Sequence, residues 1–122
     1  MASLKGSKTE QNLLAAFAGE SQARNRYTMA AKIAKKEGYE QISAIFMETA
    51  DNELEHAKVF FRQLEGGEAT ITAGYPAGVV GGTLEQLKSA AAGERMEWTT
   101  ILTGFGDLAD QEGFKDASRA FK

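Results

Sequence analysis

The chain has 122 residues with a formal net charge of −3, and 43% of them are hydrophobic. This length predicts a single domain with a buried core, and the interleaved acids and bases offer no basic stripe for nucleic acid and no polybasic segment for a membrane surface. The absence of cysteine excludes disulfides and thiolate ligands, so a bound metal would have to be held by oxygen and imidazole. No apolar run resembles a signal peptide or a membrane span, which predicts a cytoplasmic protein.

Cap and turn signals predict two helices in the first half of the chain. Residues Ser7-Lys8-Thr9-Glu10 form a predicted capping box, and the helix that follows is expected over 8–37, where Gly38 ends it. A second helix is expected over 39–64. The segment 66–82 is rich in glycine and holds the single proline, so it predicts a long crossover loop.

A second signal of the same kind, Thr83-Leu84-Glu85-Gln86, predicts a capping box that opens a third helix over 83–112. A fourth helix is expected to start at 114, with room for only about two turns. The predicted fold class is therefore all-α: a four-helix bundle with a long crossover between helices two and three and with most of the fourth helix missing. We expect residues 1–122 to form this one bundle domain.

Polar side chains occupy helix positions where the periodicity predicts apolar ones. Glu53 and His56 lie within an apolar stripe of the second helix, Glu20 interrupts the stripe of the first, and Glu94 interrupts that of the third. A buried carboxylate needs a cation or a proton to neutralise it, so the pattern indicates a metal site. For any one of these residues, a solvated glutamate or an ordinary core histidine is the alternative. The stripe of the second helix comprises Ile42, Ile45, Phe46, Thr49, Phe60 and Leu64, and that of the third comprises Leu84, Leu87, Ala91, Trp98, Ile101, Phe105 and Leu108.

Two short motifs occur twice. Ala18-Gly19-Glu20 recurs as Ala92-Gly93-Glu94, and Glu37-Gly38-Tyr39 recurs as Glu112-Gly113-Phe114. Such a repeat is expected when two related helix pairs supply equivalent ligands from both halves of a bundle. The two copies of each motif are 74 or 75 residues apart. This offset places the counterparts of Glu53 and His56 beyond Lys122, so we expect the chain to be a fragment of a longer bundle.

The candidate ligands suit a pair of redox-active cations, because carboxylates balance charge and can bridge two metals while imidazole suits iron. On a helix, residues three apart face the same way, so Glu53 and His56 can reach one metal; Glu94 and Glu97 have the same spacing. In ferritin-like di-iron proteins, two helices each provide a glutamate and the other two each provide a Glu-x-x-His pair. The chain matches this plan on three helices.

These motifs resemble those of rubrerythrins, the peroxide-reducing branch of the ferritin-like di-iron proteins. The resemblance rests on three segments in order along the chain: residues 16–27 (AFAGESQARNRY), residues 48–57 (ETADNELEHA), and Ala91-Ala92-Gly93-Glu94 leading to Glu97. It implies two iron ions as the cofactor. It further implies iron ligands at Glu20, Glu53, His56 and Glu94, an extra carboxylate ligand at Glu97 when the iron is oxidised, and a hydrogen-bond donor near the carboxylates at Tyr27.

The same resemblance implies a non-haem di-iron peroxidase that reduces hydrogen peroxide to water in oxidative-stress defence. Rubrerythrins commonly carry a cysteine-rich rubredoxin module, and this chain has no cysteine, so we expect a separate electron donor such as rubredoxin. Iron binding or storage without turnover, as in ferritins, is the main alternative, and a metal-free bundle held by packing alone is a third. Because an incomplete bundle exposes apolar surface, we also expect a homodimer, in which the two chains could exchange helices.

Overall fold

The computed structural model describes residues 3–96 and 101–121, although not the side chains of residues 94–96. This part of the chain contains helices and no strands, which confirms the predicted all-α class. No helix in it combines the length and the apolar character needed to cross a membrane. The helices are α1 (Lys8–Lys36), α2 (Glu40–Arg62), α3 (Thr83–Met96), α4 (Leu102–Gln111) and α5 (Lys115–Phe121).

The first two helices agree with the predicted ranges to within two residues, whereas the range predicted as one helix, 83–112, contains both α3 and α4. Residues 97–100, between those two helices, lie outside the described residues. The predicted start of the last helix at 114 is one residue before the observed start of α5.

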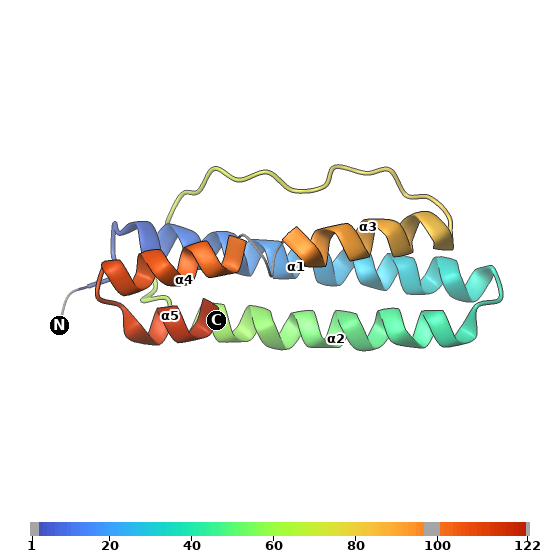
Figure 1. The fold of residues 1–122 in the computed structure, drawn as a ribbon, viewed down its shortest axis with the longest axis horizontal. Helices are drawn as coiled ribbons and strands as arrows, with labels where there is room; N and C mark the ends of the chain where they lie inside the picture. Colours follow the sequence, from blue (N-terminus) through green and yellow to red (C-terminus); the bar gives the residue numbers. More distant parts are fainter. Residues whose placement is uncertain (1–2, 97–100, 122) are drawn as a thin grey trace.

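The helices are arranged around an antiparallel hairpin of α1 and α2, which pack along each other (Figure 1). Helices α3 and α4 both contact α1, and α5 lies beside the carboxyl-terminal end of α2. The crossover between α2 and α3 is extended and runs almost the length of the molecule. It is attached to α1 where the Tyr75 hydroxyl donates to the carbonyl oxygen of Ala15 at 2.7 Å.

The repeated Glu-Gly-aromatic motif forms the same helix stop twice. Gly38 and Gly113 both have positive φ angles, of 90° and 85°. In each case the next residue's N–H donates back to the helix at 2.8 Å, from Tyr39 to the Ala34 carbonyl and from Phe114 to the Ala109 carbonyl. This is the Schellman pattern, which favours glycine because other residues are strained at positive φ. The repeat therefore encodes two equivalent hairpin turns.

The glutamate before each of these glycines binds the amino terminus of another helix. Glu37 accepts hydrogen bonds from the backbone N–H of Thr83 at 2.8 Å and from its hydroxyl. Glu112 accepts from the backbone N–H of Thr9 at 2.9 Å and from its hydroxyl. A carboxylate is well placed at a helix amino terminus, where unsatisfied N–H groups and the helix dipole favour negative charge. We call these the two Glu-Thr clamps.

One of the two predicted capping boxes is confirmed in part and the other is wrong. The Ser7 hydroxyl oxygen accepts from the N–H of Glu10 at 3.0 Å, as predicted, but the Glu10 carboxylate accepts from the N–H of Gly6 at 3.0 Å and the Ser7 N–H donates to the Leu4 carbonyl. Thr83, by contrast, is the first residue of α3, and the backbone N–H of Gln86 donates to the Gly82 carbonyl. The physical reason is that Thr83 donates to the charged Glu37 carboxylate, and charge-assisted hydrogen bonds are stronger than those between neutral groups.

Several residues of the predicted apolar stripes are exposed rather than buried. In α3, Leu84 and Leu87 are 60% and 41% exposed, and Ala91 is exposed as well. In α2, Ile45 is 54% exposed, whereas Phe46 and Phe60 are buried as predicted. The described part of α3 packs mainly against α1, so the side of α3 that carries its leucines is left uncovered. Of the predicted stripe of the third helix, Trp98 lies outside the described residues.

Replacing Glu37 with glutamine is expected to destabilise the fold at neutral pH, because a neutral amide is a weaker acceptor at the start of α3. The hydroxyl and then the backbone N–H of Thr83 lower the pKa of the Glu37 carboxyl. Its contribution is therefore complete above the ordinary glutamate pKa of about 4.3 and is lost as the pH falls through the lower pKa of the folded state.

Urea unfolding of the wild type and the Glu37→Gln variant, from about pH 7 to about pH 3, measures this effect. The difference in unfolding free energy should shrink toward acid pH. Glu68→Gln, a change of an exposed glutamate on the crossover, is the control and should show no such trend. A pH-independent difference for Glu37→Gln would contradict the clamp.

Replacing Leu13 with alanine is expected to lower the free energy of unfolding by about 3 kcal/mol, because this side chain is fully buried and the change leaves a cavity. Leu87→Ala, on the exposed side of α3, should cost less than about 0.5 kcal/mol. Chemical denaturation of both variants checks the pair. If the two variants lost similar amounts of unfolding free energy, the side of α3 that carries Leu87 would be buried in solution.

Candidate metal centre

Two glutamates are buried in the middle of the α1–α2 hairpin. Glu20 of α1 and Glu53 of α2 are 2% and 3% exposed. Toward one end of the hairpin lies an apolar cluster that includes Leu13 and Phe60, and toward the other lies a second cluster that includes Tyr27. Both carboxylates are almost completely shielded from water, so the periodicity argument correctly identified both as buried.

The imidazole of His56 completes a three-residue cluster with these carboxylates. His56 Nδ1 lies 3.6 Å from Glu20 Oε2 and 3.9 Å from Glu53 Oε1. One ligand atom from each residue can be chosen so that all three lie within 4.8 Å of one another. The side chain of His56 is 48% exposed, so the cluster opens to solvent on the histidine side.

The donor set fits a divalent cation such as iron. Oε2 of Glu20 is buried and has no hydrogen-bond partner in the described part of the chain. Leaving a buried carboxylate oxygen without a partner is costly, whereas a cation would satisfy it. Carboxylate oxygens and imidazole nitrogen are ligands that iron accepts, and carboxylates can bridge to a second metal. The three residues would hold one metal directly.

Small side chains make room for the cluster. Each buried glutamate is flanked along its helix by two buried alanines, Ala16 and Ala23 around Glu20, and Ala50 and Ala57 around Glu53. Alanine lets two helices approach closely, so the carboxylates of α1 and α2 come within reach of one histidine. Sequence reasoning did not single out these alanines. Their three- and four-residue spacing from each glutamate is the signal that could have identified them.

The remaining candidates are placed less completely. Tyr27 is buried at 5% exposure, and its ring is stacked with that of Phe46 at a centroid distance of 6.1 Å. Its role as a hydrogen-bond donor to the carboxylates stays a prediction. Glu94 belongs to α3, but its side chain is not described, and Glu97 lies outside the described residues. The structure therefore brings together Glu20, Glu53 and His56 and leaves the other two ligands as predictions.

Comparisons with known proteins agree with this geometry. The rubrerythrin family model matches residues 11–122. The chain is 60% identical over 120 residues to a rubrerythrin of Porphyromonas gingivalis, which covers 98% of this chain and 60% of that protein. It is 53% identical over 121 residues to a rubrerythrin of Nitratidesulfovibrio vulgaris, with coverage of 99% and 63%.

Among solved structures, nigerythrin in its fully reduced, all-ferrous state has a TM-score of 0.80 and 34% sequence identity, over 98% of this chain and 62% of that chain. The chain thus spans about three fifths of the length of these relatives. The family model, the sequence identity and the shared fold lead to one conclusion: the chain belongs to the rubrerythrin family, and its fold is that of a ferritin-like four-helix bundle.

Proposed function

We propose that this chain forms the metal-binding bundle of a non-haem di-iron peroxidase, which reduces hydrogen peroxide to water. The observation that carries the proposal is the cluster of Glu20, Glu53 and His56, with a buried carboxylate oxygen that lacks a hydrogen-bond partner. Membership of the rubrerythrin family supports iron as the metal. Nigerythrin has been solved in a fully reduced, all-ferrous state and in a partially reduced state, which supports a cycle between iron oxidation states.

Reduction of one peroxide molecule to two waters consumes two electrons and two protons, and a pair of ferrous ions would supply both electrons. The chain's own residues would hold and screen that pair. Glu20 and Glu53 provide negative charge in a site walled by apolar clusters, which keeps bulk water from most of the cluster. His56 is half exposed, so peroxide and an electron donor would approach from its side.

The remaining roles complete the proposal. Glu94 would be a further iron ligand, Glu97 would bind when the iron is oxidised, and Tyr27 would donate a hydrogen bond to a carboxylate. Electrons would come from a separate cytoplasmic donor such as rubredoxin. A second copy of the chain, with or without exchanged helices, would cover the exposed leucines of α3.

Replacing Glu20 with glutamine is expected to change stability in opposite directions without and with metal. Without metal, the variant should melt at a higher temperature, because a buried charge has been removed. With ferrous iron at about a hundredfold excess over the dissociation constant, the wild type should gain about 2.7 kcal/mol, and the variant should lose most of this gain.

Anaerobic thermal unfolding with and without ferrous iron measures both effects, and elemental analysis gives the iron bound per chain. Glu48→Gln, a change of an exposed glutamate on α2, is the matched control and should change neither quantity. If iron left the wild-type melting temperature unchanged, packing alone would hold the bundle and the metal site would be refuted.

Peroxide is expected to oxidise the ferrous protein much faster than dioxygen does. Stopped-flow absorption, with each oxidant mixed at equal concentration, measures the two rates. Equal or reversed rates would contradict the peroxidase. If, in addition, many irons were bound per chain, iron storage would become the better description, because the proposed site holds only a pair.

A further inference from the structure

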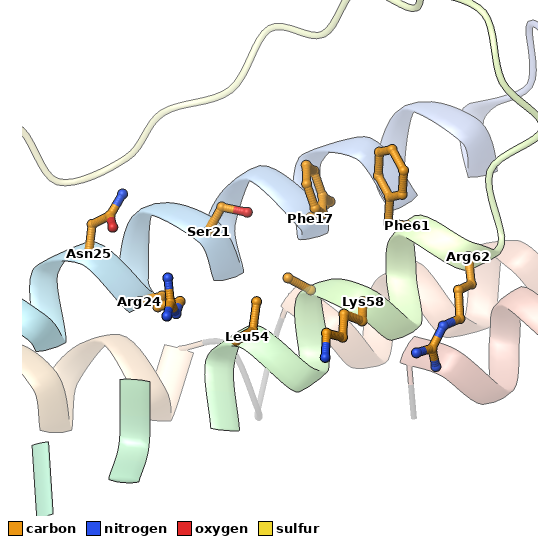
Figure 2. A pocket seen from close by; sticks show the side chains of 9 residues that line it. Phe17, Ser21, Arg24, Asn25, Leu54, Lys58, Phe61 and Arg62 are labelled. Carbon is orange, nitrogen blue, oxygen red and sulfur yellow. The ribbon is translucent and has the colours of Figure 1, made fainter. Parts of the chain in front are cut away.

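A cavity next to the metal centre is lined by residues of α1 and α2. Its volume is about 390 Å³. Three of the residues that line it each come directly after a residue of the metal cluster: Ser21 after Glu20, Leu54 after Glu53 and Ala57 after His56. Figure 2 shows the cavity, with α1 and α2 on either side of it. The metal centre uses none of the residues that line it.

The cavity is cationic although the chain as a whole is acidic. Arg24 of α1 and Lys58 and Arg62 of α2 line it, and none of the described residues in its wall is acidic. Lys58 has a partner outside the wall, since its Nζ lies 3.1 Å from Glu55, a pair that is largely exposed to water. Such exposed pairs contribute little, so the wall keeps a positive potential.

Arg24 carries the strongest indication of a ligand. Its Nε is buried and has no hydrogen-bond partner in the described part of the chain. Glu20, one turn earlier, would be the usual partner on the helix surface, but its carboxylate lies against His56. The neighbouring Arg26 is different, because its Nε donates to Gln22 at 2.7 Å. Water cannot reach this nitrogen, but the Arg24 side chain as a whole is only half-buried and lines the cavity, so an anion in the cavity would bind at its other guanidinium N–H groups.

The other end of the cavity is aromatic. Phe17 of α1 and Phe61 of α2 have ring centroids 4.8 Å apart, and Figure 2 shows them side by side away from Arg24. Phe61 is 56% exposed, so covering it would remove apolar surface from water. Phe17 and Arg24 are seven residues apart on one helix, which corresponds to about 10 Å. A ligand that reached both ends would need an anionic head and an apolar tail of this length.

We propose that this cavity binds a small amphiphilic carboxylate, with its head at the Arg24 guanidinium and its tail on Phe17 and Phe61. The planar guanidinium can donate two parallel hydrogen bonds to a carboxylate, which a lysine cannot do. The aromatic rings supply the apolar contact. This binding would not require the metal centre, so it stands apart from the proposed peroxidase activity.

Octanoate is a suitable probe, and octanamide is its neutral analogue. Isothermal titration calorimetry on the full chain should show octanoate binding at least about tenfold more tightly than octanamide, because the charged head gains hydrogen bonds with Arg24. Arg24→Gln should remove this preference, and Arg24→Lys should retain only part of it. Arg26→Gln is the matched control and should bind octanoate like the wild type.

Circular dichroism on the same samples shows whether each variant folds. If Arg24→Gln does not fold, Phe61→Ser, a change of an exposed ring, replaces it and should weaken octanoate binding. Equal affinity for octanoate and octanamide, or unchanged affinity in Arg24→Gln, would overturn the proposal. A second copy of the chain is the other possible occupant of the cavity, and sedimentation of the same samples tests it. If the wild type were a dimer that did not bind octanoate, and if Phe61→Ser were a monomer, the cavity would be part of a dimer interface and the ligand site would be overturned.

Discussion

The burial of two carboxylates in the middle of the α1–α2 hairpin is the constraint on which the rest of the structure depends. Glu20 and Glu53 lie between two apolar clusters and have almost no exposure to water. Apolar packing at both ends of the hairpin fixes the spacing of the two helices at the centre. The charge of the carboxylates then has to be balanced at that point, and a cation bound with His56 would balance it.

The residues next to each buried glutamate show how the hairpin accommodates two carboxylates at its centre. Alanines above and below each glutamate keep the helices close, while larger side chains such as Leu13, Phe46 and Phe60 form the flanking clusters. The stability of the hairpin therefore comes from its two ends, and its centre is available for chemistry. Buried polar groups at functional sites are commonly supported in this way by surrounding structure.

The two Glu-Thr clamps organise the bundle at a larger scale. Glu37 joins the end of α1 to the start of α3, and Glu112 joins the end of α4 to the start of α1. Glu37 and Glu112 are 75 residues apart, and so are Phe46 and Phe121, which are both buried, so the repeat extends to the core. The clamp at Thr83 holds α3 against α1 even though its leucines remain exposed. It thus fixes the start of the helix that carries Glu94.

The α1–α2 hairpin also carries opposite charges at two neighbouring sites. The carboxylate of Glu20 lies against His56, which leaves Arg24, one turn later, without its usual helical partner. The negative cluster and the cationic cavity are therefore two consequences of the same side-chain arrangement. Ser21 and Leu54, which line the cavity, directly follow the candidate ligands Glu20 and Glu53 in sequence.

The sequence by itself determined the helical class, the crossover, the two glycine stops and the burial of the two glutamates Glu20 and Glu53, whereas it wrongly placed the half-exposed His56 in a buried stripe. These features depend on local rules: the helical period, the conformational freedom of glycine at Gly38 and Gly113, and the cost of a buried charge. Glu94, Glu97 and Tyr27 rest on the same rules and on the resemblance to rubrerythrins, and their contacts stay predictions.

Only the tertiary structure decided which groups from distant parts of the chain meet. Thr83 donates to Glu37, 46 residues away, rather than capping its own helix, and Leu84 is exposed although the periodicity placed it in a buried stripe. Nothing in the sequence marked the Nε of Arg24 as lacking an acceptor. Hydrogen-bond partners and exposure depend on which elements pack together, and a helical period specifies a face of one helix without specifying what covers it.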